Sequence, residues 1–133
     1  MRQERILNLL ERLAQENEGV ADGRVRMASA IVHKKRIIST GINRMKSHPI
    51  MLDYGYREGQ YYVHAEVDAI VKSNITDFSK CDLYVLRLKR PSIGAKNYVY
   101  GMAKPCVGCA KLISTYEFRN VYYTTDNGTL SVL

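Results

Sequence analysis

Apolar residues near the amino terminus recur at the spacing of an α-helix. Between residues 3 and 17 they lie three and four positions apart, with Glu, Arg and Gln between them. This period places the apolar side chains on a single face, so the segment is predicted to form an amphipathic helix. The apolar face consists of Ile6, Leu9, Leu10, Leu13 and Ala14.

Two segments rich in Val and Ile follow this helix. They cover residues 25–33 and 36–42, and only Lys34 and Lys35 separate them. Short β-branched runs joined by two residues are typical of a β-hairpin. Residues 43–63 contain a proline, two glycines and four tyrosines without a clear period, so we expect a long loop. A loop of this length in a compact domain is usually functional.

The second half of the chain alternates helices and strands. A helix is expected to begin near His64, and residues 82–88 read as a buried strand. Residues 89–104 contain a proline and two glycines, which predicts a second long loop. Pro105 suits the start of the next helix, because its ring fixes φ and its missing N–H costs no hydrogen bond in the first turn.

The chain ends in two predicted strands joined by a tight turn. VYYTT at 121–125 is followed by Asp-Asn-Gly and then by TLSVL. The last strand should pair antiparallel with its predecessor, because a parallel pair needs a crossover of about a dozen residues. The order of elements predicts an α/β domain of two or three layers with a mixed sheet of about five strands. Residues 1–133 are expected to form a single domain.

Composition narrows the class of protein. The hydrophobic fraction of 46% is that of a globular chain. No apolar run approaches the roughly 18 residues that cross a bilayer, and the amino terminus alternates charge with leucine, unlike a signal peptide. Three cysteines, two of them in a C-x-x-C pair, do not suggest a secreted disulfide framework. We therefore expect a soluble cytoplasmic protein without a membrane partner.

The charge is strongly basic and unevenly distributed. The net charge is +7, from 20 Lys and Arg against 13 Asp and Glu. No acidic residue lies between Arg24 and Asp53 or between Arg87 and Lys104, although both stretches are rich in basic residues. This balance favours an anionic partner such as a nucleotide or a nucleic acid. A solvated basic surface that only maintains solubility would give the same pattern.

Two short motifs carry the candidate chemistry. They are His-Ala-Glu at 64–66 and Pro-Cys-Val-Gly-Cys at 105–109, and each falls at a predicted helix start. His64, Cys106 and Cys109 offer one imidazole and two thiolates, a donor set that suits Zn²⁺. Cysteines in a first turn also lie near the positive end of the helix dipole, which favours the thiolate form.

An open, catalytic zinc site is favoured over a structural one. A structural site needs a fourth protein ligand, and the remaining candidates, His33, His48 and Cys81, have no partner at finger-like spacing. Three ligands leave one position for water, so we expect one catalytic zinc per chain. Glu66 lies two residues after His64, so it need not be a ligand and can move protons at the activated water.

Each motif taken alone has a simpler explanation. A histidine at a helix start can be a cap, a C-x-x-C pair can be a redox site, and a buried Glu can pair with a lysine. The combination is more specific, because H-x-E on one helix start and P-C-x-x-C on the next is the pattern of zinc-dependent nucleobase deaminases.

The chain resembles the cytidine and deoxycytidylate deaminase superfamily from about Val25 to Tyr123. HAEVDAI at 64–70 resembles its zinc helix, and KPCVGCAKLI at 104–113 resembles its second motif. RIISTGINRMKSHP at 36–49 resembles the preceding strand and loop in nucleotide-type and tRNA-type members. Among these, the chain is most similar to small phage-type deoxycytidylate deaminase-like proteins.

This resemblance implies a cytidine-deaminase-like three-layer fold and zinc-dependent hydrolysis of cytosine to uracil, in a nucleotide of the deoxycytidylate or cytidine type. It also implies that Asn43 binds the sugar and that the backbone of Ala65 contacts the base. Two departures bear on the substrate. Asp68 stands where many deoxycytidylate deaminases have Asn, and the chain turns back at Asn127-Gly128, as free-cytidine and bacterial toxin deaminases do.

The two predicted loops should supply the remaining substrate contacts, because each immediately precedes a ligand motif. We expect contacts from Arg44, Lys46, Tyr62 and Lys104. Tyrosines interleaved with basic residues also suit single-stranded DNA or RNA, so a polynucleotide cytosine deaminase is an alternative. The same tyrosines could instead be packing residues. A tRNA adenosine deaminase and a catalytically silent nucleic-acid binding module are further alternatives.

Overall fold

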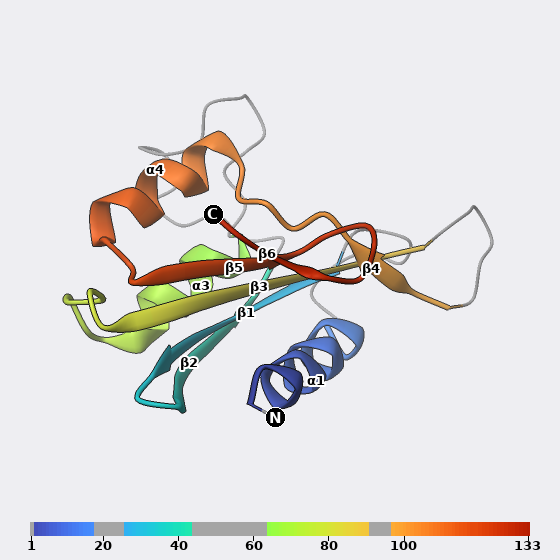
Figure 1. The fold of residues 1–133 in the computed structure, drawn as a ribbon, viewed down its shortest axis with the longest axis horizontal. Helices are drawn as coiled ribbons and strands as arrows, with labels where there is room; N and C mark the ends of the chain where they lie inside the picture. Colours follow the sequence, from blue (N-terminus) through green and yellow to red (C-terminus); the bar gives the residue numbers. More distant parts are fainter. Residues whose placement is uncertain (1, 18–25, 44–63, 91–96) are drawn as a thin grey trace.

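The computed structural model describes residues 2–17, 26–43, 64–90 and 97–133 (Figure 1). Helices in these ranges are α1 (Arg2–Gln15), α3 (Ala65–Ser73) and α4 (Val107–Tyr116). The strands are β1 (Arg26–His33), β2 (Arg36–Ile42), β3 (Cys81–Lys89), β4 (Val99–Gly101), β5 (Asn120–Thr124) and β6 (Leu130–Val132). None of the described helices combines the length and apolar composition needed to cross a membrane.

The strands form one mixed sheet. Its order is β2-β1-β3-β5-β6, with β4 paired to the end of β3. β3 and β5 are parallel, and the other pairs are antiparallel. The predicted hairpin and the antiparallel last strand are therefore confirmed, and the sheet is mixed as expected.

The structure differs from the sequence predictions in the number of strands and in the first residue of one helix. The sheet has six strands rather than about five, because residues 99–101 form β4 inside the stretch predicted as a loop. A three-residue strand is too short to show a period of two, and the glycines around it read as loop residues. The helix predicted from Pro105 begins instead at Val107, with Cys106 as its N-cap residue.

Helices cover both faces of the sheet, which gives the expected three layers (Figure 1). Alternate residues of β1 and β3 point to opposite faces, so each strand contributes to two apolar cores. The α1 face joins Ile6, Leu10 and Ala14 to Ala28, Ala30, Val32, Tyr84, Leu86 and Leu88. The α3/α4 face joins Val67, Ile70, Leu112 and Ile113 to Ile31, Leu83, Val85 and Val121.

The turn between β1 and β2 has an unfavourable backbone for its sequence. His33 pairs with Arg36, so only Lys34 and Lys35 make the connection. Both have positive φ, 48° and 70°, as in a type I′ turn, which strongly prefers Asn-Gly. A left-handed residue other than glycine costs roughly 1–2 kcal/mol, so two lysines here are locally destabilising.

Candidate active site

The predicted metal ligands lie at the first turns of two helices. His64 is the N-cap residue of α3, with extended backbone (φ −83°, ψ 158°). Cys106 is the N-cap residue of α4, and its Sγ accepts a hydrogen bond from the Cys109 amide at 3.5 Å. Helix N-termini carry partial positive charge, so both ends favour anionic ligands such as thiolates.

The structure brings the three predicted ligands together. His64 Nδ1 lies 3.0 Å from Cys109 Sγ and 3.6 Å from Cys106 Sγ. The three donor atoms lie within 4.8 Å of one another, and no further His, Cys, Asp or Glu of the described ranges joins them. Tetrahedral zinc with usual bond lengths separates a nitrogen and a sulfur ligand by roughly 3.6 Å. The donor set and its spacing therefore fit zinc.

Hydrogen bonds divide the charge unequally between the two cysteines. Hydrogen bonds from Cys109 and from His64 lower the pKa of Cys106 to about 4, against the opposing effect of burial. The same contact with Cys106, together with burial, raises the pKa of Cys109. The hydrogen bond to Cys106 also raises the pKa of His64. These hydrogen bonds favour the thiolate form of Cys106, and a metal cation would replace the protons that the cluster shares.

Glu66 is buried beside this cluster without a complete set of hydrogen bonds. It lies in the first turn of α3, is 2% exposed, and belongs to none of the ion pairs among the described residues. Its Oε1 atom has no hydrogen-bond partner there. Burial raises the pKa of Glu66 above its usual range. Burying such an oxygen unpaired is costly, which indicates that a water or substrate group satisfies it.

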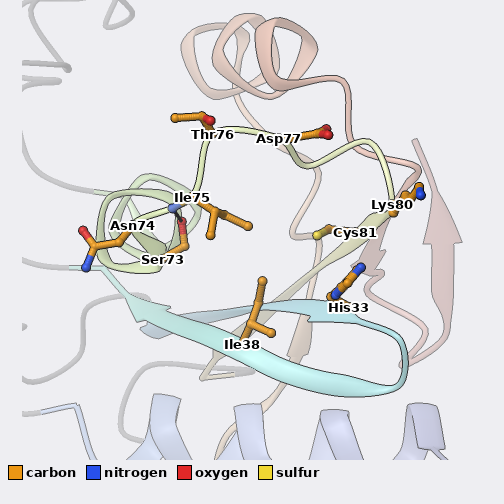
Figure 2. Close-up of a pocket in the computed structure, with 9 residues that line it drawn as sticks. All are labelled: His33, Ile38, Ser73, Asn74, Ile75, Thr76, Asp77, Lys80 and Cys81. Carbon is orange, nitrogen blue, oxygen red and sulfur yellow. Dashed lines mark hydrogen bonds between the residues drawn. The ribbon is translucent and has the colours of Figure 1, made fainter.

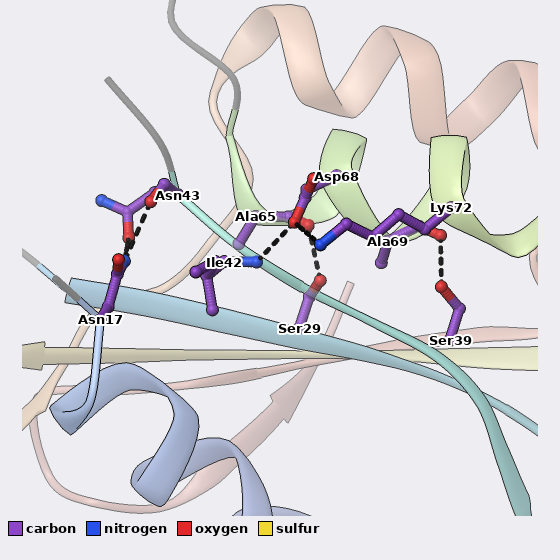
Figure 3. Close-up of polar contacts among 9 residues, drawn as sticks. All are labelled: Asn17, Ser29, Ser39, Ile42, Asn43, Ala65, Asp68, Ala69 and Lys72. Carbon is purple, nitrogen blue, oxygen red and sulfur yellow. Dashed lines mark hydrogen bonds and ion pairs between the residues drawn. The ribbon is translucent and has the colours of Figure 1, made fainter. Parts of the chain in front are cut away.

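Close backbone contact fixes α3 on the hairpin (Figure 3). Ser29 Oγ donates to the carbonyl oxygen of Ala65 at 2.7 Å, and Ser39 Oγ donates to that of Ala69 at 2.7 Å. Gly41 on β2 faces the same helix, and a Cβ atom there would overlap the Ala65 carbonyl oxygen and the Ala69 amide nitrogen. The absence of a side chain at Gly41 is what allows α3 to approach so closely.

Asp68 adds a polar contact between α3 and β2. Its Oδ2 accepts a hydrogen bond from the Ile42 amide at 3.0 Å and pairs with Lys72 at 2.9 Å (Figure 3). Asp68 is only 7% exposed. The residue that departs from the common Asn of deoxycytidylate deaminases therefore holds the zinc helix in place and is not itself among the grouped metal ligands.

Asn43, the predicted sugar contact, is held from two sides. Its Oδ1 accepts a hydrogen bond from Asn17 Nδ2 at 3.0 Å (Figure 3). The same oxygen accepts from the Met27 amide at 2.9 Å. Asn17 also donates to the Asn43 carbonyl oxygen at 2.9 Å and is 2% exposed. Sequence reasoning missed Asn17. The available signal was its spacing from Leu10 and Ala14, which places a polar amide on the apolar face of the helix.

The structure describes only some of the other predicted substrate residues. Arg44, Lys46 and Tyr62 lie outside the described residues, as does most of the predicted loop 43–63. Lys104 is exposed two residues before Cys106. Ala65 is fully buried, and Ser29 occupies its carbonyl oxygen. Its N–H is at the first position of α3, where no intrahelical acceptor exists, so the amide is the group suited to contact a base.

Tyr100, from the second predicted loop, is a packing residue. Its ring packs against the α1 core, and its hydroxyl donates to Glu11 Oε2 at 3.0 Å. Burial and this hydrogen bond raise the pKa of Tyr100 to about 12. This tyrosine therefore serves the fold, as the alternative interpretation of the tyrosines anticipated.

A pocket of about 590 Å³ lies at the far end of α3 from the ligands (Figure 2). Ile38 and Ile75 face it, and so do His33 and Cys81, two of the three residues considered as a fourth zinc ligand. Cys81 is 2% exposed, and burial raises its pKa, as expected for a structural thiol. The pocket contains none of the predicted site residues, so it is not the place of the chemistry.

Comparison with known proteins gives a family match and similar folds. The family model described as "Cytidine and deoxycytidylate deaminase zinc-binding region" matches residues 1–125. A search of curated proteins finds no match.

Solved structures of two deaminases are similar to this chain. Cytidine deaminase from Burkholderia pseudomallei aligns with a TM-score of 0.65 and 13% identity, over 100% of this chain and 92% of its own. The dCMP deaminase from the cyanophage S-TIM5 aligns in its apo form with a TM-score of 0.55 and 20% identity, over 92% and 82% of the two chains. Its complex with dCMP and dUMP gives 0.57 and 21%, over 95% and 85%. At these identities the likeness shows the fold.

Proposed function

The chain belongs to the cytidine and deoxycytidylate deaminase family, and from this premise we propose that it hydrolyses the amino group of a cytosine nucleotide of the deoxycytidylate type. The products would be the uracil nucleotide and ammonia. The observation that carries this proposal is the buried Glu66, with an unpaired carboxylate oxygen beside three grouped metal ligands. A further support is the likeness to a phage enzyme solved in complex with dCMP and dUMP.

His64 Nδ1 and the sulfurs of Cys106 and Cys109 would hold the zinc of this family. Zinc, when bound, acts as a Lewis acid that makes a water molecule nucleophilic near neutral pH. The protein positions its ligands through the helix caps, because His64 and Cys106 are both N-cap residues. Their placement therefore depends on where α3 and α4 begin.

Glu66 would carry the protons of the reaction. A C–O bond forms at C4 of cytosine and the bond to the amino nitrogen breaks, so protons must leave the water and reach the base. Glu66 would take one proton from the water and deliver it to N3, then take the second proton from the hydroxyl group formed at C4 and deliver it to the amino group, which leaves as ammonia. Its raised pKa suits this exchange, because a group that both accepts and donates protons works best when its pKa lies near the ambient pH.

Asn43 and Ala65 would orient the nucleotide. Hydrogen bonds from Asn17 and Met27 hold the amide oxygen of Asn43 in place, and the family resemblance gives this side chain the contact with the sugar. The N–H of Ala65 could donate to an acceptor on the base. Arg44, Lys46, Tyr62 and Lys104 remain predicted contacts to the rest of the nucleotide.

The experiment compares substrates directly. The protein is incubated with deoxycytidine monophosphate, with deoxycytidine, and with a cytosine-containing oligonucleotide, and uracil formation is measured for each. We expect conversion of the monophosphate. The net charge of +7 supports a polynucleotide as the second candidate, and conversion of the oligonucleotide alone would replace the first proposal with that one. No conversion of any of the three would contradict both.

Glu66→Gln separates the chemistry from the metal. This variant removes the acid–base group but changes no proposed ligand, so we expect about one zinc per chain and a loss of turnover of at least roughly a hundredfold. Zinc content is measured by atomic absorption alongside uracil formation. Loss of zinc in this variant would show that Glu66 serves the metal site rather than proton transfer.

A further inference from the structure

A second cavity lies on the α1 face of the sheet, away from the metal ligands. Its volume is about 520 Å³, and it is formed by the start of α1, the β1–β2 turn and the residues before β5. We call it the basic pocket, because four of its side chains are cationic. These are Arg5, Lys34, Lys35 and Arg119, and the only carboxylate in the lining is Asp82.

The carboxylate of the basic pocket is already neutralised. Arg119 donates to both oxygens of Asp82, from Nε at 3.0 Å and from Nη2 at 2.8 Å. The Asn120 amide donates to the same carboxylate at 3.2 Å. Within the described ranges, neither Arg5 nor the two lysines forms an ion pair. The pocket therefore presents three uncompensated positive charges from two separate segments.

The β1–β2 turn gives a second reason to regard the basic pocket as a binding site. Lys34 and Lys35 are both exposed and both have positive φ, where Asn-Gly would be the stable choice. A local sequence that conflicts with its own backbone is a feature of functional sites, where another gain offsets the strain. Here the two strained residues are also the cations that line the cavity.

The first turn of α1 and the apolar floor complete the pocket. Gln3 and Arg5 come from the N-terminal end of a 14-residue helix, whose partial positive charge also favours an anion. Ile6 and Val32 form part of the floor. The volume lies in the range of small-ligand sites. The pocket of Figure 2 has a similar volume, but its lining contains one carboxylate, Asp77, against one lysine, Lys80, so it lacks the excess of cations.

We propose that the basic pocket binds clustered phosphate groups, either contiguous ones in an oligophosphate or consecutive ones in a nucleic-acid strand. Three cations lining one cavity suit a ligand with several negative charges close together, and phosphate is the common anion with that density. This binding would be separate from deamination, because the pocket lies on the α1 face and the metal ligands lie on the α3/α4 face. It therefore does not depend on which substrate reaches the zinc.

The test uses a double substitution that removes charge without harming the fold. Lys34→Asn with Lys35→Gly installs the favoured turn sequence, so the melting temperature should rise by a few degrees. Binding of inorganic tripolyphosphate and of a fluorescent twelve-residue oligothymidylate is measured at low salt by calorimetry and by fluorescence anisotropy. We expect the double variant to bind at least one of them roughly tenfold more weakly than the parent.

A charge-matched control is Arg12→Gln with Lys111→Gln, two exposed cations outside the pocket. It should retain parental binding. Binding of tripolyphosphate would identify contiguous phosphates as the source, and binding of the oligonucleotide alone would identify a strand. Equal loss in the control would show that only net charge matters and would overturn the proposal. The proposal would also be overturned if the parent protein bound neither probe, or if the turn variant bound them as tightly as the parent does.

Discussion

α3 and α4 each bring part of the metal centre to the same face of the sheet, yet different contacts hold them there. α3 is attached through its backbone carbonyls, which accept from Ser29 and Ser39, through the Asp68 side chain, and by the close approach at Gly41. No side-chain hydrogen bond among the described residues joins α4 to the sheet. Two of its side chains, Leu112 and Ile113, are instead buried in the apolar core.

The end of α4 shows the same reliance on apolar contacts. Phe78 is fully buried, and its ring lies 5.1 Å from that of Tyr116 and 4.8 Å from that of Phe118. The helix ends at Tyr116, and the N–H of its C-cap residue Glu117 donates to two carbonyl oxygens of the last turn. Directional contacts fix position more narrowly than apolar ones. The hairpin therefore sets the place of His64 and Glu66 by directional contacts, while apolar packing sets the place of α4 and its cysteine ligands.

Gly41→Ala should produce the largest effect on this arrangement. The added methyl group would meet backbone atoms of α3, which cannot rotate away as a side chain can. We expect the free energy of unfolding to fall by about 3 kcal/mol, together with weaker zinc binding. Urea unfolding and zinc titration measure the two effects.

Gly101→Ala is the matched control for that substitution. A Cβ atom at Gly101 would meet only the flexible side chains of Lys89 and Arg87, at 3.1–3.3 Å. Its cost should stay below about 1 kcal/mol. If both alanine variants lost the same stability, the close approach of α3 to β2 would not be the reason.

Removal of zinc should distinguish the two helices next. Chelation removes the link between α3 and α4, and α4 has fewer directional contacts to replace it. We expect amide hydrogen exchange in residues 107–116 to accelerate roughly tenfold or more, with a smaller change in residues 65–73. Hydrogen exchange followed by mass spectrometry measures both segments in one experiment, and an equal acceleration would contradict the comparison.

Substitutions of Asp68 should give the smallest effects and show which of its contacts matters. Asp68→Asn keeps an acceptor for the Ile42 amide but removes the charge that pairs with Lys72, whose side chain is exposed. Its cost should be below about 1 kcal/mol. Asp68→Ala leaves the amide without its acceptor and should cost about 2 kcal/mol. Equal costs, measured by urea unfolding, would assign the role to the charge instead.

Local patterns were sufficient to predict most elements and the metal ligands. The apolar period of α1 and the two-residue connection of the hairpin are readable within a few positions of the chain. The spacing of His64, Cys106 and Cys109 relative to helix starts predicted their assembly. The family match and the likeness to a cytidine deaminase structure agree with the expected fold.

Contacts between segments far apart in the sequence could not be predicted from local patterns. Asn17 reaches Asn43 across 26 positions, and Gly41 is needed because of a helix that begins 24 residues later. Neither residue carries a local signal of its partner. β4 was missed because three residues cannot show a period. Arg44, Lys46 and Tyr62 lie outside the described residues, and their roles stay predictions.

The separation of the ligands along the chain has a consequence for how the protein assembles. His64 is 42 residues from Cys106 and 45 from Cys109, so the metal centre closes a long loop. Closing such a loop is entropically costly unless other structure brings its ends together first. The intervening β3 does this by pairing with both β1 and β5. We therefore expect the sheet to form before the metal binds, with zinc acting as a late cross-link that slows unfolding.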